Sequence, residues 1–244
     1  MKILSFGRPL VRKLIDNSPW LASWDASDVN EIFDKGELRE YEKAELVYKD
    51  YETPEILFIA TGSVWICLRN TNGVAKFGMM FPTSIIGVSQ LLRNTQSDSP
   101  CYEFYAVEKC VVFAVPTKIF LDRLANKPLL WRTVAEASIF FQRKCMRLAL
   151  LLYVGTTKER LSTALHHYGQ PKGTKSQPSQ TRIVSISQED LAILIQSSRQ
   201  HVNRALKELE SEELIVLGYK KIEIIKPDEL ERIALSRHLG ISAS

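Results

Sequence analysis

Residues 185–215, SISQEDLAILIQSSRQHVNRALKELESEELI, carry the clearest structural signal in this chain of 244 residues. Ser187 precedes an acidic first turn and then an apolar face, which is how a capped helix begins. After a break at residues 196–198, a second helix is predicted from residue 199 to about 212. Its buried stripe recurs at i, i+3, i+4 and i+7 and consists of Val202, Ala205, Leu206 and Leu209. Two short helices joined by a tight turn predict a helix-turn-helix.

The outward face of the second predicted helix carries long hydrogen-bonding side chains and no acid. They are Arg199, Gln200, Asn203, Arg204 and Lys207. Arginine can bind guanine O6 and N7 with two hydrogen bonds, and glutamine or asparagine can bind adenine N6 and N7 in the same way. Any surface helix can show these residue types to solvent, so the face alone leaves DNA binding and simple solvation open.

A short β-hairpin is predicted directly after the two helices. Residues 214–217 and 220–225 form its strands, with Gly218 and Tyr219 between them. Lys220 and Lys221 are placed to reach a phosphate backbone, although they can also be ordinary solvated turn residues. A helix-turn-helix followed at once by a hairpin predicts a winged helix.

A long helix is predicted upstream, over residues 128–154, where no Gly or Pro follows Pro128. Its apolar residues are spaced 4, 3, 4, 4, 3 and 4 apart, which is close to a heptad repeat. They are Leu130, Val134, Ala137, Phe141, Cys145, Leu148 and Leu152. We predict that the six residues after Leu130 form a homodimer interface. The stripe could equally pack against the β part of its own chain.

Short β-rich runs dominate the first half of the chain. They cover residues 46–48, 56–60, 63–68, 74–81, 102–107 and 110–115. Short strands at regular spacing predict an antiparallel sandwich or jelly roll. Ahead of them, residues 16–35 predict short helices, with Ser27 as a candidate N-cap. The predicted fold is therefore α+β, with a β-roll sensor domain (1–127), a long dimerisation helix (128–154) and a winged helix-turn-helix domain (155–244).

Composition restricts the chemistry. The chain is 25 % charged and 45 % hydrophobic and has no window approaching the roughly 18 apolar residues of a membrane span, so we expect a cytoplasmic protein with no membrane partner. The four cysteines form no CxxC pair, and we expect no metal site. His166 and His167 are expected to be ordinary surface residues. With no glycine-rich phosphate loop and no nucleophile motif, we expect no enzyme and no cofactor.

Net charge becomes informative only locally. The total of +4 divides evenly, because residues 1–154 hold 19 basic and 17 acidic side chains and residues 155–244 hold 13 and 11. Within the second half, three basic residues lie in 199–207, while acids gather at 208–213 and 228–231. In the net charge of residues 155–244, these flanking acids therefore cancel the basic face at 199–207.

The order of β-roll, long helix and winged helix resembles the cyclic-AMP receptor protein / fumarate-nitrate regulator (CRP/FNR) family of bacterial transcription factors. The resemblance covers residues 16–227 and is strongest at 185–215. It implies a homodimeric regulator that binds double-stranded DNA at a two-fold symmetric site, with RNA polymerase as a partner if it activates. Arg199 and Arg204 match base-contacting arginines of the family, whereas Ser187, Gln188 and Ser198 match positions that hold the DNA backbone.

Two residues depart from the family pattern. Gln200 stands where many members have a glutamate, which implies an altered half-site. Gln196 replaces a small residue, often glycine, at the turn, so a left-handed backbone there would be mildly strained. The complete set of predicted DNA contacts is Ser187, Gln188, Ser198, Arg199, Gln200, Asn203, Arg204, Lys207, Lys220 and Lys221.

The sensor half departs from the family's cyclic-nucleotide binders. Gly87 is present but is followed by Val88 and Ser89 in place of glutamate, and residues 99–102, Ser-Pro-Cys-Tyr, stand where an Arg-Ser pair would hold the phosphate. Losing that guanidinium removes the charge that offsets burial of a phosphate, which argues against cyclic AMP in the usual mode. No cysteine precedes Cys67 to hold an oxygen-sensing cluster, and the sensor half has no histidine to hold haem.

A small-molecule effector of hydrophobic character stays open, as does the absence of any ligand. The candidate pocket lining is Trp65, Phe77, Met79, Phe81, Gly87, Cys101, Phe141 and Cys145. Ordinary core packing explains the same residues, and a redox signal through Cys101 or Cys110 is a third alternative. The rival for the whole chain is a cyclic-nucleotide-binding-like ligand-binding or scaffold protein without a DNA role. It would require acidic or apolar residues on the face at 199–207, where there are none.

Overall fold

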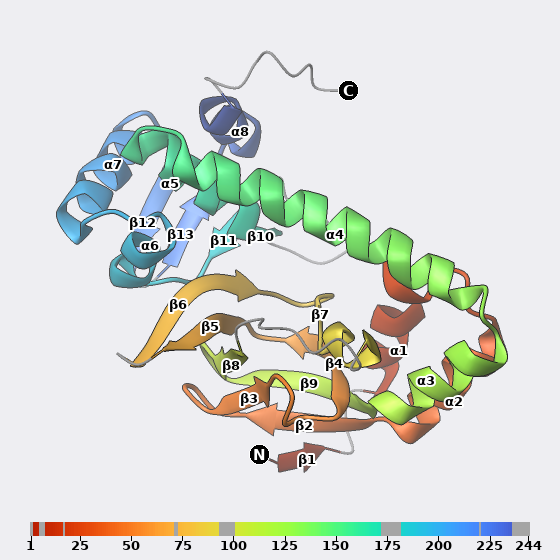
Figure 1. Cartoon of the computed structure of the whole chain (residues 1–244). Coiled ribbons are helices and arrows are strands. Elements are labelled where there is room, and N and C mark those ends of the chain that lie inside the picture. The colour runs from red at the N-terminus through yellow and green to blue at the C-terminus, as the bar shows by residue number, and fades with distance from the viewer. Residues whose placement is uncertain are drawn as a thin grey trace. The chain divides into compact units, whose positions relative to one another are not determined.

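The computed structural model describes residues 2–4, 8–16, 18–70, 73–92, 101–171, 182–219 and 221–235. It divides the chain into two compact units, Met1–Phe141 and Gln142–Ser244 (Figure 1). The division falls inside the long helix α4 (Leu130–Tyr153). The domain boundaries expected from the sequence lie near the two ends of this same helix. Within the described ranges, no helix is both long enough and apolar enough to cross a membrane.

The first unit is built on two antiparallel sheets. One has the order β1 (Lys2–Leu4), β2 (Glu37–Tyr41), β9 (Cys110–Pro116), β4 (Glu55–Thr61) and β7 (Ile85–Ile86). The other has the order β3 (Leu46–Lys49), β8 (Tyr102–Ala106), β5 (Val64–Asn70) and β6 (Gly73–Met80). All six predicted runs are strands of this roll, which confirms the predicted α+β class with an antiparallel N-terminal part.

Strands β1, β2 and β7 have no counterpart in the sequence prediction. In β2, ELREY, the apolar alternation is hidden by charged residues that pair across the sheet. The Arg39 guanidinium donates to both carboxylate oxygens of Glu55, at 2.6 Å each, and also contacts Glu37. The charge of Arg39 offsets that of the more buried Glu55, whereas the Glu37 side chain is 40 % exposed to water. A strand that looks too polar can therefore lie inside the sheet.

Helices close the first unit over one sheet. They are α1 (Arg8–Asp16), the 3-10 turn η1 (Pro19–Leu21), α2 (Ala26–Lys35), the 3-10 turn η2 (Val88–Leu92) and α3 (Thr117–Asn126). Together with the first turns of α4 they bury a core that includes Ile32, Phe113 and Val134. The N-cap of α2 is Asp25, whose carboxylate accepts from the Asp28 backbone N–H at 3.0 Å. The prediction that Ser27 caps this helix was therefore wrong. Its hydroxyl instead donates to Asp25.

The second unit is a winged helix with additions. Its elements are α5 (Thr157–Tyr168), β10 (Gln170–Pro171), β11 (Arg182–Val184), α6 (Gln188–Leu194), α7 (Arg199–Ser211), β12 (Ile215–Gly218), β13 (Lys221–Ile224) and α8 (Pro227–Leu235). The sheet order is β10-β11-β13-β12, antiparallel throughout. A capping box starts α5: the Thr156 hydroxyl accepts from the Glu159 backbone N–H, and the Glu159 carboxylate accepts from the Thr156 backbone N–H. Residues 172–181, between β10 and β11, lie outside the described residues.

Candidate nucleic-acid interface

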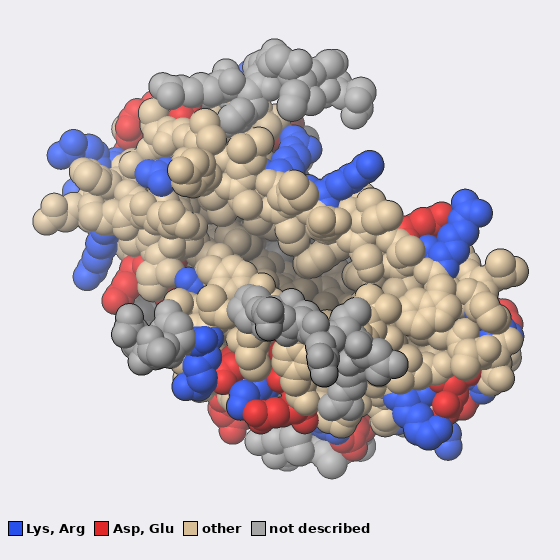
Figure 2. Space-filling model, in the orientation of Figure 1, with Lys and Arg blue, Asp and Glu red and all other residues tan. Residues whose placement is uncertain are grey.

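Helix α7 separates an apolar face from a basic one. Val202, Leu206 and Leu209 are fully buried, as the periodicity predicted. On the opposite side, Arg199, Gln200, Arg204 and Lys207 are exposed and Asn203 is half-buried. Among the described residues, none of the four exposed side chains has a hydrogen bond or an ion pair. Figure 2 shows Lys and Arg side chains projecting at the edge of the molecule where Figure 1 places α7. Their donors are free for an external acceptor.

The acidic residues that follow this face are used to hold the unit together. Lys158 of α5 donates to the Glu208 carboxylate at 2.8 Å and to the Glu212 carboxylate at 2.6 Å. Glu210 accepts from the Leu217 backbone N–H at 2.9 Å, which ties α7 to the first strand of the wing. The acids therefore anchor the C-terminal half of α7 and leave its basic N-terminal half unopposed.

Two serines fix where the paired helices begin. The Ser187 hydroxyl accepts from the Asp190 backbone N–H at 3.0 Å at the start of α6, and Ser198 does the same for His201 at 3.2 Å at the start of α7. Capping satisfies an N–H that has no partner within the helix. Their expected contacts with the DNA backbone stay predictions, as does that of the half-buried Gln188.

The turn between α6 and α7 passes through a left-handed residue. Gln196 has φ of 49°, the conformation that its place in the family pattern predicted. The backbone N–H of Ser197 donates to the Ala192 carbonyl at 2.9 Å and holds the turn closed. A side chain with a Cβ is strained in this region, whereas glycine is not.

We therefore expect Gln196→Gly to stabilise the second unit by roughly 0.5–1 kcal/mol, because relief of the left-handed strain outweighs the extra entropy of the unfolded chain. Urea unfolding followed by circular dichroism measures the change. Ser197→Gly, at the next position, is the control and should not stabilise. If Gln196→Gly instead destabilises the unit, the glutamine side chain contributes more to stability than the left-handed backbone strain costs.

The wing is a hairpin of β12 and β13. Gly218 pairs with Lys221 at its end, and Tyr219 between them is 90 % exposed. Lys221 is exposed, as expected of a residue that reaches outward. Lys220 lies outside the described residues.

The helix pair and its wing match one family model, that of the Crp-like helix-turn-helix domain, over residues 159–233. This chain carries a Crp-like helix-turn-helix domain. The Crp-like domain runs from the first turn of α5 into α8, so it includes both capped helices, the left-handed turn and the wing. No curated protein sequence matches the chain.

Solved structures share the fold over most of the chain. FixK2 from Bradyrhizobium japonicum has a TM-score of 0.66 at 17 % identity, covering 86 % of this chain and 99 % of its own. A CRP-family transcriptional regulator from Thermus thermophilus has a TM-score of 0.59 at 19 % identity, and the match covers 80 % of this chain and 96 % of the regulator. A putative cyclic nucleotide binding protein from Ruegeria pomeroyi has a TM-score of 0.68 at 16 % identity, and the match covers 94 % of this chain and 99 % of that protein. The β-roll upstream of the Crp-like domain is thus of the cyclic-nucleotide-binding type in fold.

The residues of the expected effector pocket are divided between the two units. Trp65 and Met79 are buried partners across β5 and β6, with the Lys76 ammonium 4.7 Å from the Trp65 ring centre. Phe77 is half exposed against Tyr102, and Phe81 is half-buried. Phe141 ends the first unit and Cys145 belongs to the second. Packing within the sheet therefore explains the burial of Trp65 and Met79. Core packing was one of the alternatives that the sequence left open for these residues.

The phosphate-cassette region contains a buried acid. Asp50 is 8 % exposed, accepts from the Ser89 hydroxyl at 3.2 Å, and has its pKa raised by burial. Gly87 has φ of +90°, and a Cβ there would lie within about 3.0 Å of the Tyr48 hydroxyl oxygen. Cys101 lies beside this group, with its Sγ 3.5 Å from the Asp50 carbonyl oxygen. A phosphate near Asp50 would meet a carboxylate in place of a guanidinium.

Burial raises the pKa of the three thiols of the first unit. Burial raises the pKa of Cys110 to about 12 and that of Cys67 to about 11, and it also raises the pKa of Cys101. Since the thiolate is the reactive form, these cysteines have little of it at neutral pH. This chemistry disfavours the redox alternative.

Helix α4 leaves the core partway along its length. Val134 and Ala137 are buried within the first unit, so their side chains are already covered by their own chain. From Phe141 onward the helix is open: Phe141 and Cys145 are exposed, and Leu148 and Leu152 are half-buried. A second stripe that the sequence prediction missed is more exposed still. It consists of Ile139, Met146, Leu150 and Tyr153, which are 50 to 80 % exposed.

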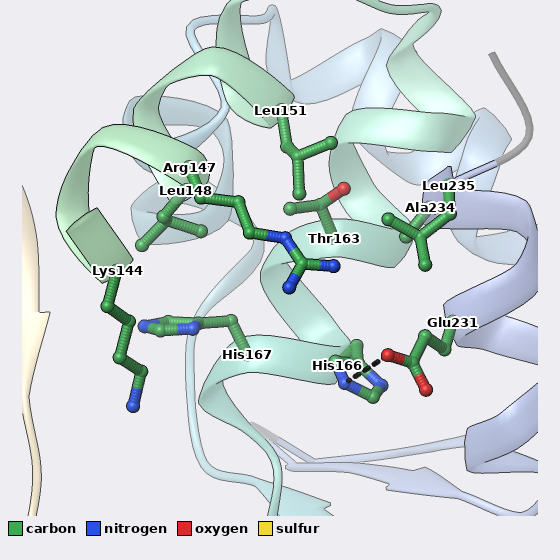
Figure 3. A pocket seen from close by; sticks show the side chains of 10 residues that line it. All are labelled: Lys144, Arg147, Leu148, Leu151, Thr163, His166, His167, Glu231, Ala234 and Leu235. Carbon is green, nitrogen blue, oxygen red and sulfur yellow. Dashed lines mark ion pairs between the residues drawn. The ribbon is translucent and has the colours of Figure 1, made fainter. Parts of the chain in front are cut away.

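The second unit also contains a pocket between α4, α5 and α8 (Figure 3). Its lining is Lys144, Arg147, Leu148, Leu151, Thr163, His166, His167, Glu231, Ala234 and Leu235. Both histidines are half-buried in this lining, so the expectation that they are ordinary surface residues was wrong. Burial, followed by the charge of Lys144, lowers the pKa of His167 to about 4.

This shift predicts a loss of stability in mild acid. The unfolded chain takes up the His167 proton near pH 6.5, whereas the folded chain takes it up only near pH 4. Between these values the unfolded state binds more protons, so stability is complete above pH 6.5 and falls as the pH falls toward 4. From pH 7.5 to 5.5 we expect a loss of about 1.4 kcal/mol from this residue.

Urea unfolding at the two pH values measures this loss. His167→Gln should remove most of it, whereas His201→Gln, at an exposed position of α7, should not. An equal loss in the His167→Gln variant would assign the acid sensitivity to other groups.

Proposed function

We propose that this protein is a sequence-specific transcription regulator that binds double-stranded DNA as a homodimer at a two-fold symmetric operator. The observation that carries the proposal is the outward face of α7, where four exposed hydrogen-bonding side chains have no partner among the described residues. The Crp-like domain match supports a DNA-binding regulator of this type. In a dimer the two α7 helices would enter successive major grooves about 34–36 Å apart.

The proposed contacts divide into two kinds. Arg199, Gln200, Asn203 and Arg204 would contact base edges, because they lie on the N-terminal turns of α7. The remaining contacts would hold phosphates and set the register on the duplex. They are Ser187, Gln188, Ser198, Lys207, Lys220 and Lys221.

The proposed dimer interface is the open part of α4. Phe141, Cys145, Leu148 and Leu152 keep the role that the heptad spacing predicted, and the stripe at Ile139, Met146, Leu150 and Tyr153 extends it. Exposed apolar side chains on adjoining faces of one helix form a contiguous patch of the kind that marks an interaction surface. Val134 and Ala137 are left out, because their own unit already buries them.

We propose a signal other than a cyclic nucleotide, or none, since Asp50 places a carboxylate in the cassette region. If a signal acts, it would rotate the two Crp-like domains about residues 154–156, where α4 ends and α5 begins. RNA polymerase would be a partner if the protein activates transcription. We propose a cytoplasmic location, no membrane partner and no catalytic role.

Selection from random double-stranded DNA tests the proposal. The full-length protein should enrich an inverted repeat whose half-sites are about one helical turn apart. The rival, a ligand-binding or scaffold protein with no DNA role, predicts no enriched motif after repeated rounds. That outcome would overturn the assignment.

A further inference from the structure

The pocket between α4, α5 and α8 has the features of a small-anion site. We propose that it binds a small organic carboxylate, with the carboxylate group at Arg147 and Lys144 and a short aliphatic chain against the leucines. The pocket lies wholly within the second unit and involves none of the proposed DNA contacts. The proposal therefore stands independently of the operator and of the sensor β-roll, and it shares only Leu148 with the proposed dimer interface.

Two cations of α4 supply the charge. Lys144 and Arg147 are three residues apart and both line the pocket. Neither has a hydrogen bond or ion pair with any other described residue. Figure 3 shows the Arg147 guanidinium extending from α4 toward Thr163 and His166 of α5. A guanidinium presents its donors as a planar fork that matches the two oxygens of a carboxylate.

A buried hydroxyl in the same pocket lacks a partner. Thr163 is 4 % exposed, and its Oγ1 has no hydrogen bond within the described structure. Buried hydroxyls in folded proteins nearly always have a partner, and a ligand or a water is the usual one where the protein supplies none. Thr163 Oγ1 can donate a hydrogen bond to the same anion that Arg147 holds.

The charge balance selects an anion over a cation. The one acid of the lining, Glu231, faces His166, with 3.7 Å between its Oε1 and the histidine Nε2. Burial is the largest cause that lowers the pKa of both histidines. The charge of Lys144 lowers the pKa of His167 further. Arg182 and Arg147 lower the pKa of His166, whereas Glu231 raises it. The cations disfavour protonation of the neighbouring histidines because they create a positive electrostatic potential in the pocket. A bound anion would be stabilised by the same potential.

Size and surface select the class of anion. The cavity measures about 160 Å³, which is roughly the volume of five water molecules. Its apolar wall is Leu148, Leu151, Ala234 and Leu235. Inorganic phosphate or sulfate would fill the charged end and leave this wall in contact with polar oxygens. A carboxylate with about three further carbons, such as butyrate, would satisfy both ends.

Titration of the full-length protein with butyrate tests the proposal. The chain has only four histidines, and two of them line the pocket, so their ring C–H signals in the NMR spectrum report on the site. We expect the signals of His166 and His167 to shift saturably, at millimolar butyrate, while those of His201 and His238 stay in place. The thermal midpoint should rise with butyrate concentration, because the ligand binds only the folded state.

Matched variants locate the binding. Arg147→Gln should weaken butyrate binding about tenfold or more through loss of the charge-assisted pair, and Thr163→Val should weaken it severalfold at unchanged volume. Arg143→Gln removes an exposed arginine of the same helix that does not line the pocket, and it should leave binding unchanged. The midpoint without ligand shows that each variant is folded.

Three results would overturn the proposal. They are the absence of a saturable shift of the two histidine signals, equal affinity in the Arg147→Gln and Arg143→Gln variants, and equal affinity for inorganic phosphate and butyrate. The last would mean that the apolar wall contributes nothing and that the pocket does not select an organic carboxylate.

Discussion

Replacement of Arg199 and Arg204 together by alanine is expected to reduce affinity for the selected operator to the level of random DNA. Each bidentate contact between arginine and guanine contributes roughly 1–3 kcal/mol of discrimination, and a dimer presents each arginine twice. The combined loss of about 4–12 kcal/mol covers the usual gap between specific and non-specific binding, about 4–10 kcal/mol. Fluorescence anisotropy with labelled operator and scrambled duplexes at one salt concentration measures it.

The structure makes this variant interpretable. Both arginines are exposed and have no partner among the described residues, so their removal should leave the unfolding transition unchanged. Arg232→Ala, on the exposed side of α8, is the matched control for lost positive charge and should retain the preference for the operator. If the double variant still discriminates operator from scrambled DNA, the base contacts lie elsewhere and the proposed role of α7 is wrong.

Introducing charge into the open face of α4 should convert the dimer to a monomer. Met146 and Leu150 are 65 % and 54 % exposed in the single chain, so glutamates at both positions cost little within it. In a paired α4 seam, four carboxylates would become buried near one another without partners, at a cost of several kcal/mol each. We expect the Met146→Glu, Leu150→Glu double variant to be monomeric at micromolar concentration by analytical ultracentrifugation.

Loss of the dimer should also lower operator affinity, because each half-site would then bind alone. Leu129→Glu is the control: Leu129 is 88 % exposed, precedes α4, and is not part of the proposed interface. It should remain dimeric. A double variant that still sediments as a dimer would place the interface outside this stripe, and a wild-type monomer would remove the dimer proposal altogether.

Prediction from the sequence succeeded where the signal is local. The cap at Ser187 was predicted from its hydroxyl, the acidic turn that follows it and the apolar face beyond, and the structure confirms it. The left-handed Gln196 was expected because the family pattern has a small residue there. Such features depend on a few neighbouring backbone groups, which a short stretch of sequence specifies.

Prediction failed where the outcome depends on which surface covers a residue. The spacing of apolar residues identified α4 over nearly its full length, but the same spacing fits a helix on its own core and a helix on a partner. The structure resolves this position by position, since Val134 lies in the core of the first unit while Phe141 is exposed. In β2 the failure had another source, because the Glu55 that neutralises Arg39 lies on a different strand.

The sequence by itself determined the order of β-roll, long helix and winged helix, and the basic outward face of α7, because each follows from apolar periodicities of a few residues. Only the tertiary structure decided that Arg147, Thr163, His166 and Glu231 share one pocket. These residues belong to three helices, of which α4 and α5 are consecutive while α8 begins only at Pro227, and no local pattern links them. Their proximity arises from the packing of α4, α5 and α8, so the pocket has no signature in the sequence.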